Sequence, residues 1–417
     1  MVQGKEEGTI EQFPAWLNQE LFREYLERDF PDLKTVKSFR LETTGGNGEN
    51  YTTLLLRAKF ELELKDGSQQ STSYMAKVLP NNGNRENVIS WQVFEKERTT
   101  YGQYVPEFEQ MYRDAGKKIT FGAHYYEPKE PLKEEEVIVL EDLGRRGFRN
   151  VNRHIGLDIQ HAEAVLEKLA HFHAASAVRF QLKGAYPAVY NRNLCSKQDD
   201  FKEFRHNQIK AFVEALPLYE ASDLAQSVES FGRQAEDMFQ QYAPQIDGEF
   251  RVLNHGDAWC NNFMFQYDKS TGKISEIYFV DLQMSRFCSP AQDLLYFILS
   301  STQLDIKIAK FDHFIKYYHD KLTENLKLLK YPKQLPSLRG LHQSIFTYGD
   351  WILPIITVLL PIVLVDGSDD ANMDSMMDSE GSGEKFRNNL FKNPRIIRNQ
   401  KEILPWAHRR GAFEVPK

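Results

Sequence analysis

The hydrophobic and polar positions divide the chain into a strand-rich first part and a longer helix-rich second part. Residues 51–64 combine threonine and leucine with alternating charged positions, and residues 71–79 form a second extended run after turn-forming residues at 65–68. A short aliphatic run follows at residues 136–140. These patterns predict an antiparallel sheet with a β-hairpin between residues 35 and 139.

Apolar side chains at steps of three and four predict the helices. Residues 87–101 show this spacing and predict one helix after the second strand. Residues 159–173 show it more strongly and predict a long helix with a single apolar stripe that ends at a buried histidine. Residues 201–242 predict two or three further helices. A short hairpin is predicted inside this helical part, with strands at residues 263–266 and 274–280.

The C-terminal region contains three segments of different character. Residues 351–365 are apolar but short and contain Pro354 and Pro361, which predicts a buried or broken helix and not a membrane span. Residues 366–384 are rich in Gly, Ser, Met and acidic residues and predict a solvated mobile loop. The tail beyond them is basic, and we interpret it as a helix docked on the larger lobe, with phosphate binding as the alternative. The basic residues of this tail include Arg387, Lys392, Arg395, Arg398 and Arg409.

Composition narrows the class of protein. The 417 residues favour two or three units, and the net charge of -7 without a dense basic run argues against nucleic acid as a partner. Three cysteines without paired spacing and an N-terminus without an apolar signal region predict a cytoplasmic protein. Neither a membrane nor an obligate protein partner is indicated. We expect two lobes, formed by residues 1–143 and 144–417.

A predicted loop and hairpin bring three oxygen-bearing side chains together. Asp257 and Asn262 are five residues apart, and Asn262 directly precedes the first strand of the hairpin. Asp281 closes the second strand, so the antiparallel return places it beside Asn262. Because magnesium takes carboxylate and amide oxygens together with substrate phosphates, the arrangement predicts a nucleotide–magnesium site. The alternative is that Asp257 caps a loop and Asp281 is a turn residue.

This constellation resembles the catalytic scheme of the protein-kinase-like phosphotransferases. The His255-Gly256-Asp257 sequence is similar to the aminoglycoside phosphotransferase and choline kinase branch, whereas protein kinases have His-Arg-Asp. Other segments extend the likeness, in order, from about residue 40 to residue 300. Together they resemble the ecdysteroid kinase-like family, insect small-molecule kinases also labelled CHK kinase-like. These segments are residues 48–51, 74–78, 94–97, 139–143 and 169–176.

The resemblance implies an α+β, protein-kinase-like fold with a small β-rich N-terminal lobe and a larger helical C-terminal lobe. It also implies ATP and Mg²⁺ as cofactors. Lys77 would hold the α- and β-phosphates, and Glu97 would pair with it. A surface ion pair is the alternative, but Lys77 stands inside an apolar strand, where an unpaired ammonium is costly.

The same likeness assigns the remaining site residues. Asp257 would orient the acceptor hydroxyl and accept its proton, while Asn262 and Asp281 would bind magnesium. The glycine-rich turn before the hairpin would contact phosphates through backbone N–H groups. The further residues expected to bind the nucleotide are Gly46, Asn47, Gly48, Glu141 and Leu143.

The acceptor is expected to be a small molecule. Asp281 is followed by Leu282-Gln283 and not by Phe-Gly, and Asp293 comes soon afterwards, which leaves little room for a peptide-docking platform. The resemblance implies phosphorylation of an apolar alcohol, such as an ecdysteroid or a hydroxylated xenobiotic in detoxification. A choline- or aminoglycoside-type kinase and an inactive pseudokinase are the alternatives. Six aromatic residues of the second lobe either line an apolar pocket or belong to the core: Tyr186, Tyr190, Phe201, Phe204, Phe212 and Tyr219.

Overall fold

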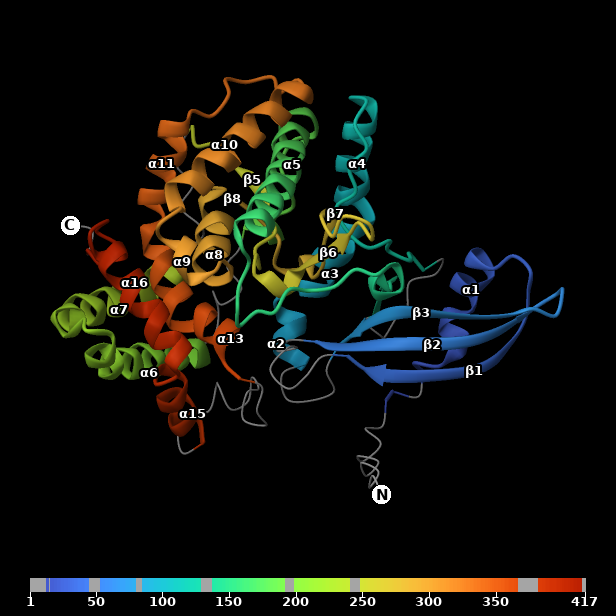
Figure 1. Cartoon of the computed structure of the whole chain (residues 1–417), viewed down its shortest axis with the longest axis horizontal. Coiled ribbons are helices and arrows are strands. Elements are labelled where there is room, and N and C mark those ends of the chain that lie inside the picture. The colour runs from blue at the N-terminus through green and yellow to red at the C-terminus, as the bar shows by residue number, and fades with distance from the viewer. Residues whose placement is uncertain are drawn as a thin grey trace.

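The chain forms two lobes in the computed structural model, a sheet with a few helices and a larger helical body beside it (Figure 1). This is the two-lobe, kinase-like α+β fold that the resemblance implies. The structure describes residues 13–14, 16–44, 53–79, 85–128, 137–191, 199–240, 248–366 and 382–414. The glycine-rich turn with Gly46, Asn47 and Gly48 lies outside these residues, and so do residues 367–381 of the acidic segment.

The smaller lobe is built on a four-stranded antiparallel sheet in the described part of the chain. Its strands lie in sequence order and are β1 (Leu33–Thr43), β2 (Leu54–Leu64), β3 (Gln69–Val78) and β4 (Val137–Glu141). The predicted hairpin is confirmed, because β2 and β3 pair from Leu54–Val78 to Glu63–Gln69 around a turn in which Gly67 has a φ of +85°. A left-handed residue of this kind favours glycine.

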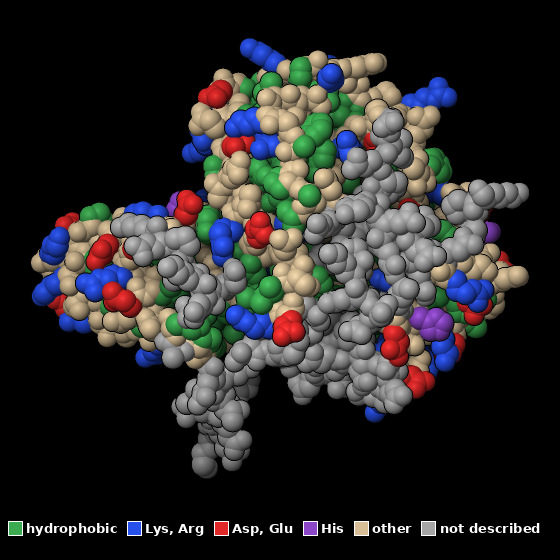
Figure 2. All heavy atoms as spheres, turned by 180° about the vertical axis from the view of Figure 1, so that it is seen from behind, with side chains coloured by type: hydrophobic (Ala, Val, Ile, Leu, Met, Phe, Trp, Pro, Cys, Tyr) green, Lys and Arg blue, Asp and Glu red, His purple; other side chains and the backbone are tan. Residues whose placement is uncertain are grey.

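The two faces of the sheet differ as the alternating pattern of β2 requires. Leu56, Ala58, Phe60 and Leu62 are buried and form a small core with the helix α1 (Arg23–Asp29). Lys59, which lies between them, is exposed and pairs with Glu42 of β1 at 2.6 Å. From behind, the sheet lobe shows side chains of both charges interspersed (Figure 2). The mixed surface fits the absence of a dense basic run in the sequence.

The helix predicted over residues 87–101 is interrupted, so this prediction is wrong in detail. The chain forms α2 (Arg85–Ser90), breaks at Gln92 with a φ of +55°, and continues as α3 (Val93–Thr99). A π-helical turn then leads into α4 (Val105–Asp114). A left-handed residue ends the regular hydrogen-bonding pattern, and periodicity alone does not reveal it.

The larger lobe packs around a long central helix. The predicted helix is confirmed as α5 (Ile159–Lys183), which lies along α10 (Phe311–Leu328). The buried helix α8 (Ala291–Ser301) contacts α10 and belongs to the same core. The two short sheets of this lobe pair β5 with β8 and β6 with β7, and the second pair is the predicted hairpin. The other bounds are α6 (Asp199–Ala215), α7 (Ala225–Gln240), β5 (Val252–Asn254), β6 (Phe263–Tyr267), β7 (Ile274–Phe279), β8 (Arg286–Cys288), α9 (Leu304–Lys307), α11 (Leu338–Thr347), α12 (Ile352–Pro354), α13 (Leu360–Leu364), α15 (Ser382–Phe391) and α16 (Pro394–His408).

The C-terminal region is helical on both sides of the undescribed acidic residues. The apolar segment forms a continuous but irregular helical run, with a π-helical turn at Ile355–Leu359. No single helix of the described residues is long and apolar enough to cross a membrane, and only the bent pair Leu338–Thr347 with Gly349–Leu364 reaches that length and composition. The basic tail forms α15 and α16, whose buried side chains join the main core. Because α15 begins at Ser382, the loop predicted to extend to residue 384 ends earlier.

The main core extends across both lobes. Leu79, Phe94, Ile138 and Leu140 come from the sheet lobe, yet they belong to the same buried cluster as the helices of the larger lobe. A boundary between residues 143 and 144 stays a prediction. The shared cluster places the end of β3, helix α3 and the end of β4 against the larger lobe.

Candidate active site

Strand β3 places a buried lysine at the junction of the two lobes. Lys77 lies between Leu55 of β2 and Ile138 of β4 in the sheet register, and its side chain is only 6% exposed. Its Nζ lies 2.6 Å from Oε2 of Glu97 on α3 and 2.8 Å from Oδ1 of Asp281. Burial by itself would lower the pKa of Lys77, but the two carboxylates outweigh it and raise the pKa. The ammonium therefore stays charged.

Glu97 is held in an apolar environment on α3. Burial raises its pKa, and the nearby Lys77 acts in the opposite direction. The second carboxylate oxygen, Oε1, is buried and has no hydrogen-bond partner within the described residues. The pair with Lys77 is therefore the interaction that compensates for burying this carboxyl group.

The loop between β5 and β6 carries Asp257. Its Oδ2 accepts a hydrogen bond of 2.8 Å from Nδ2 of Asn262, which also donates to the Asp257 main-chain carbonyl. Its Oδ1 accepts one of 2.7 Å from the hydroxyl of Tyr296 on α8. Burial and the charge of Asp281 raise the pKa of Asp257 to about 6, although the hydrogen bonds from Tyr296 and Asn262 lower it. The carboxylate is thus fixed in orientation and more basic than an ordinary aspartate.

Asp281 directly follows β7 and returns toward the start of the hairpin. The main-chain N–H of Val280 donates to the carbonyl of Asn262 at 3.0 Å, which confirms that the antiparallel return brings the two segments together. Asp281 has φ 61° and ψ 64°. Aspartate tolerates the left-handed region better than most residues, but a strained position of this kind costs about 1 kcal/mol or more and is typical of functional sites.

Asp293 on α8 anchors the loop from behind. It accepts hydrogen bonds from the main-chain N–H groups of His255 at 2.7 Å and Gly256 at 2.9 Å, and it lies 3.2 Å from Nε2 of His173. The His255 ring is buried, and its Nε2 lies 3.1 Å from the carbonyl of Val280. These contacts give His255 a bracing role in the loop that carries Asp257. The buried position predicted for His173 is also confirmed.

Sequence reasoning missed the site contacts of Asp293 and Tyr296. Both residues lie on α8, and both reach the loop that carries Asp257. A polar group at each of these positions in a mostly apolar helix was the available signal. The sequence spacing does not reveal the partner of either residue, because about 40 residues separate α8 from the loop.

The available oxygen atoms fit a hard divalent cation. Both Nδ2 hydrogen bonds of Asn262 go to Asp257, and none of the hydrogen bonds found among the described residues uses its amide oxygen. Asp281 directs Oδ1 to Lys77, and its side chain is 31% exposed. Among the described residues, its Oδ2 accepts a single long bond, of 3.3 Å from Gln283. One carboxylate and one amide oxygen, completed by phosphate oxygens and water, suit magnesium.

Glu141 and Leu143, the two residues at the end of β4 that we expect to contact the nucleotide, differ in their surroundings. The carboxylate of Glu141 pairs with Arg146 at 3.1 Å and accepts from the N–H of His124, so this side chain already has partners. Leu143 is buried at the start of a 3-10 helix capped by Asp142. The side chains of both residues are thus engaged within the protein.

The aromatic side chains of the larger lobe belong to the core. Tyr186, Tyr190, Phe204, Phe212 and Tyr219 are all buried. Tyr186, Tyr190, Phe212 and Tyr219 pack on neighbouring aromatic rings, and the Tyr219 hydroxyl donates to the carbonyl of Phe391. The core alternative is thus confirmed for these five, while the side chain of Phe201 lies outside the description. They carry no information about an acceptor pocket.

Comparisons with known proteins agree with this geometry. A search of curated proteins found no match. The family model of the ecdysteroid kinase-like family matches residues 47–331, about two thirds of the chain, and this range includes Lys77, Glu97, Asp257, Asn262 and Asp281. The protein therefore belongs to the ecdysteroid kinase-like family, which makes it a kinase-like phosphotransferase by family.

Proposed function

We propose that the protein is an ATP-dependent kinase that transfers the γ-phosphoryl group to a hydroxyl of a small apolar alcohol, such as an ecdysteroid or a hydroxylated xenobiotic. The observation that supports this most is the convergence of three segments on one place. Lys77 contacts Asp281, and Asp257 contacts Asn262, while the hairpin joins the two pairs. A structural role would not require all of these groups together.

Lys77 and Glu97 form the phosphate-binding part of the proposed site. The ammonium is buried, charged and held from two sides, so it is ready to bind the α- and β-phosphates of ATP. Asn262 and Asp281 would hold magnesium, which bridges phosphate oxygens and neutralises their charge when it is bound. The turn with Gly46, Asn47 and Gly48 belongs to the same proposal.

Asp257 is the proposed catalytic residue. With a pKa of about 6 it is mostly ionised at pH 7, yet it is a better proton acceptor than an ordinary aspartate. Tyr296 and Asn262 hold its two oxygens in a fixed orientation. The carboxylate would align the acceptor hydroxyl and take up its proton as phosphoryl transfer proceeds.

A small acceptor is supported by the short segment after Asp281. A 3-10 turn at Leu282–Met284 and strand β8 fill nearly all of the chain between Asp281 and the start of α8 at Ala291. This leaves no length for the activation loop on which protein kinases dock a peptide. The name of the family favours an apolar, steroid-like alcohol over a polar amine.

A product screen tests the function. Purified protein is incubated with ATP, magnesium and a panel of steroid and xenobiotic alcohols, and products are scored by the mass of one added phosphoryl group. Asp257→Asn should lower turnover by about 10²- to 10⁴-fold, whereas Asp223→Asn, an exposed aspartate outside the site, should not. Equal turnover of the wild type and Asp257→Asn would contradict the assignment.

A binding measurement separates the alternatives. ATP with magnesium at about 100 times its Kd should stabilise the wild type and Asp257→Asn by about 2.7 kcal/mol, and Lys77→Met should lose most of this shift. A shift without any product would indicate a pseudokinase. Products only from choline-like amines would replace the apolar acceptor and keep the enzyme class.

A further inference from the structure

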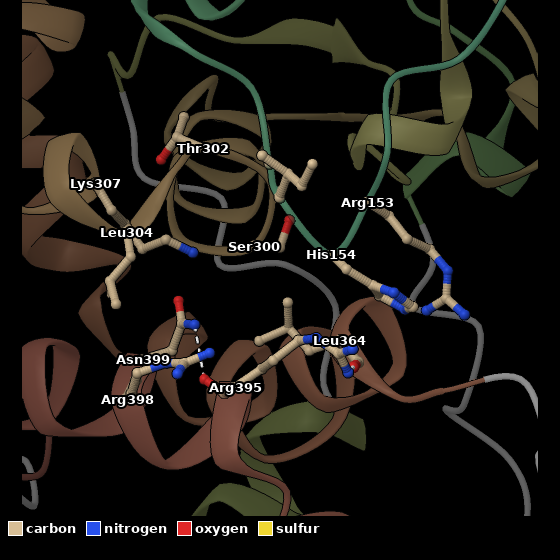
Figure 3. Close-up of a pocket in the computed structure, with 12 residues that line it drawn as sticks. Arg153, His154, Ser300, Thr302, Leu304, Lys307, Leu364, Arg395, Arg398 and Asn399 are labelled. Carbon is tan, nitrogen blue, oxygen red and sulfur yellow. Dashed lines mark hydrogen bonds between the residues drawn. The ribbon is translucent and has the colours of Figure 1, made fainter.

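A cavity of about 80 Å³ lies in the larger lobe beside the C-terminal helices. Loop 153–156, the end of α8, helix α9 and helix α16 surround it (Figure 3). None of its lining residues belongs to the candidate active site. Five of them are basic: Arg153, His154, Lys307, Arg395 and Arg398.

Part of this positive charge is explained by the end of α13. Nη1 of Arg153 donates to the carbonyls of Ile362 at 3.0 Å and Val363 at 2.7 Å. Arg395 reaches the carbonyl of Leu364 at 3.4 Å. Carbonyls at the end of a helix lack partners within the helix and carry partial negative charge, so cations there are stabilising. Capping of α13 therefore accounts for these two arginines.

Lys307 caps the last turn of α8 in the same way, whereas within the described residues Arg398 caps no helix. Lys307 is 1% exposed, and its Nζ makes a 2.6 Å hydrogen bond to the carbonyl of Leu299. Within the described residues, neither Lys307 nor Arg398 forms an ion pair. The carboxylate of Asp366 lies 2.9 Å from Arg395 and offsets part of the charge of that arginine. The cavity thus holds more positive than negative charge.

Burial without a counter-charge weakens the protonation of Lys307. Its pKa is lowered by burial to about 7. Figure 3 shows Lys307 and Ser300 on one side of the hollow and Arg395, Arg398 and Asn399 on the other. An anion between them would accept hydrogen bonds from both sides and favour the charged ammonium.

We propose that this cavity binds the phosphate group of a small anion. Its volume exceeds the roughly 30 Å³ that one water occupies in the liquid, so there is room for a tetrahedral oxyanion. Guanidinium and ammonium groups are the preferred protein donors to phosphate, and they converge here from α9 and α16. The site is separate from the proposed ATP site and does not depend on its function.

A partly apolar groove adjoins the cavity and suggests what else the anion carries. The two share Ile155 and Leu304, and the groove of about 690 Å³ continues along Ile308 and Ala309. Its polar lining residues are Gln303, Asp305 and Glu402. Ile155 is 62% exposed although it is a large aliphatic residue. The phosphate group therefore belongs either to inorganic phosphate or to a phosphate monoester of an apolar alcohol, whose organic part would cover the groove.

Two serines connect the cavity to the loop that carries Asp257. The hydroxyl of Ser300, which lines the cavity, lies 2.8 Å from that of Ser301. The Ser301 hydroxyl accepts a 3.0 Å hydrogen bond from the N–H of Cys260. A ligand in the cavity would therefore lie two side chains away from the main chain of the catalytic loop.

Calorimetric titration of the full chain with inorganic phosphate tests the proposal. A non-hydrolysable ATP analogue with magnesium is kept at saturation, so that phosphate cannot report on the nucleotide site. The wild type should bind phosphate. Arg398→Gln and Lys307→Met should each weaken binding about tenfold or more, because each removes a charged hydrogen-bond donor. Arg398 is exposed, so its variant should fold even if the buried Lys307→Met variant does not.

Arg409→Gln is the matched control. Arg409 is exposed at the end of the same helix and does not line the cavity, so its loss changes the net charge equally. Absence of phosphate binding to the wild type, or the same Kd in the wild type, Arg398→Gln and Arg409→Gln, would overturn the proposal.

A second titration identifies the source of the phosphate group. Octyl phosphate is compared with inorganic phosphate in the wild type and in Leu304→Ser. Tighter binding of octyl phosphate that Leu304→Ser abolishes would support a monoester with its chain in the groove. Equal binding of both ligands would support inorganic phosphate. Both results require that Arg398→Gln weakens binding, and an unaffected Arg398→Gln would again overturn the site.

Discussion

Gly256 lies directly against the main-chain carbonyl of Met284. Its φ is +83°, and a Cβ atom at this position would overlap the Met284 oxygen. The contact joins the loop that carries Asp257 to the segment that follows Asp281. Two physical features therefore require glycine in the His-Gly-Asp sequence: the left-handed backbone and the close approach of another chain segment.

We expect Gly256→Ala to destabilise the fold and displace Asp257. The left-handed φ costs about 1 kcal/mol for alanine, and the overlap with Met284 adds to it, so the free energy of unfolding should fall by more than about 2 kcal/mol. Urea unfolding measures the change. Gly67→Ala is the control, because Gly67 has a similar φ of +85° with open space around it. Equal losses in the two variants would contradict the close contact.

Tyr296→Phe should lower turnover without weakening ATP binding. The variant removes the 2.7 Å hydrogen bond to Oδ1 of Asp257 but keeps the ring that fills the core. We expect kcat to fall about tenfold, with the KM for ATP unchanged. Tyr186→Phe removes a buried hydroxyl that donates to the carbonyl of Ser176, outside the site, and serves as the control. A similar fall of kcat in both variants would indicate a general loss of packing.

Asp293→Asn should destabilise the catalytic loop. The carboxylate accepts N–H groups on both oxygens, from His255 and from Gly256, and an amide offers only one acceptor oxygen. One buried N–H would lose its partner, which costs about 1–3 kcal/mol. Urea unfolding and turnover should both report the change. Asp305→Asn, at an exposed aspartate, should leave them unaltered. Unchanged stability of Asp293→Asn would show that the loop is held by other contacts.

His171 should make the protein less stable in mild acid. Burial, helped by the charges of Lys117 and Lys168, lowers the pKa of His171 to about 3. Below pH 6.5, the usual value for the unfolded chain, the unfolded state binds the proton and the folded state does not. This group alone should reduce the free energy of unfolding by about 2 kcal/mol between pH 7 and pH 5.

The variant His171→Gln checks this effect. Glutamine offers an oxygen to Lys117, which lies 2.8 Å from Nε2 of the histidine, and it does not titrate. Unfolding curves of both proteins at pH 7 and pH 5 give the slopes. The free energy of unfolding should depend less steeply on pH in the variant, by about one proton taken up on unfolding. Equal pH dependence in the two proteins would show that His171 does not contribute.

The elements that depend on neighbouring residues could be predicted from the sequence. The alternating pattern over residues 54–64 and the turn that contains Gly67 specify the β2–β3 hairpin, and the apolar stripe specifies α5. The approach of Asp281 to Asn262 could also be predicted, because the second strand of an antiparallel hairpin ends beside the start of the first strand. These relationships span few residues, so spacing and turn chemistry are sufficient to determine them.

Contacts between distant segments were decided by the tertiary structure. The break at Gln92, the support of Asp257 by Tyr296 and the convergence of Lys307 with Arg398 depend on how helices pack against one another. The burial of the aromatic side chains depends on it too. Periodicity shows that a helix has an apolar face, but any apolar face of suitable size can cover it, so the partner is chosen only when the whole core packs.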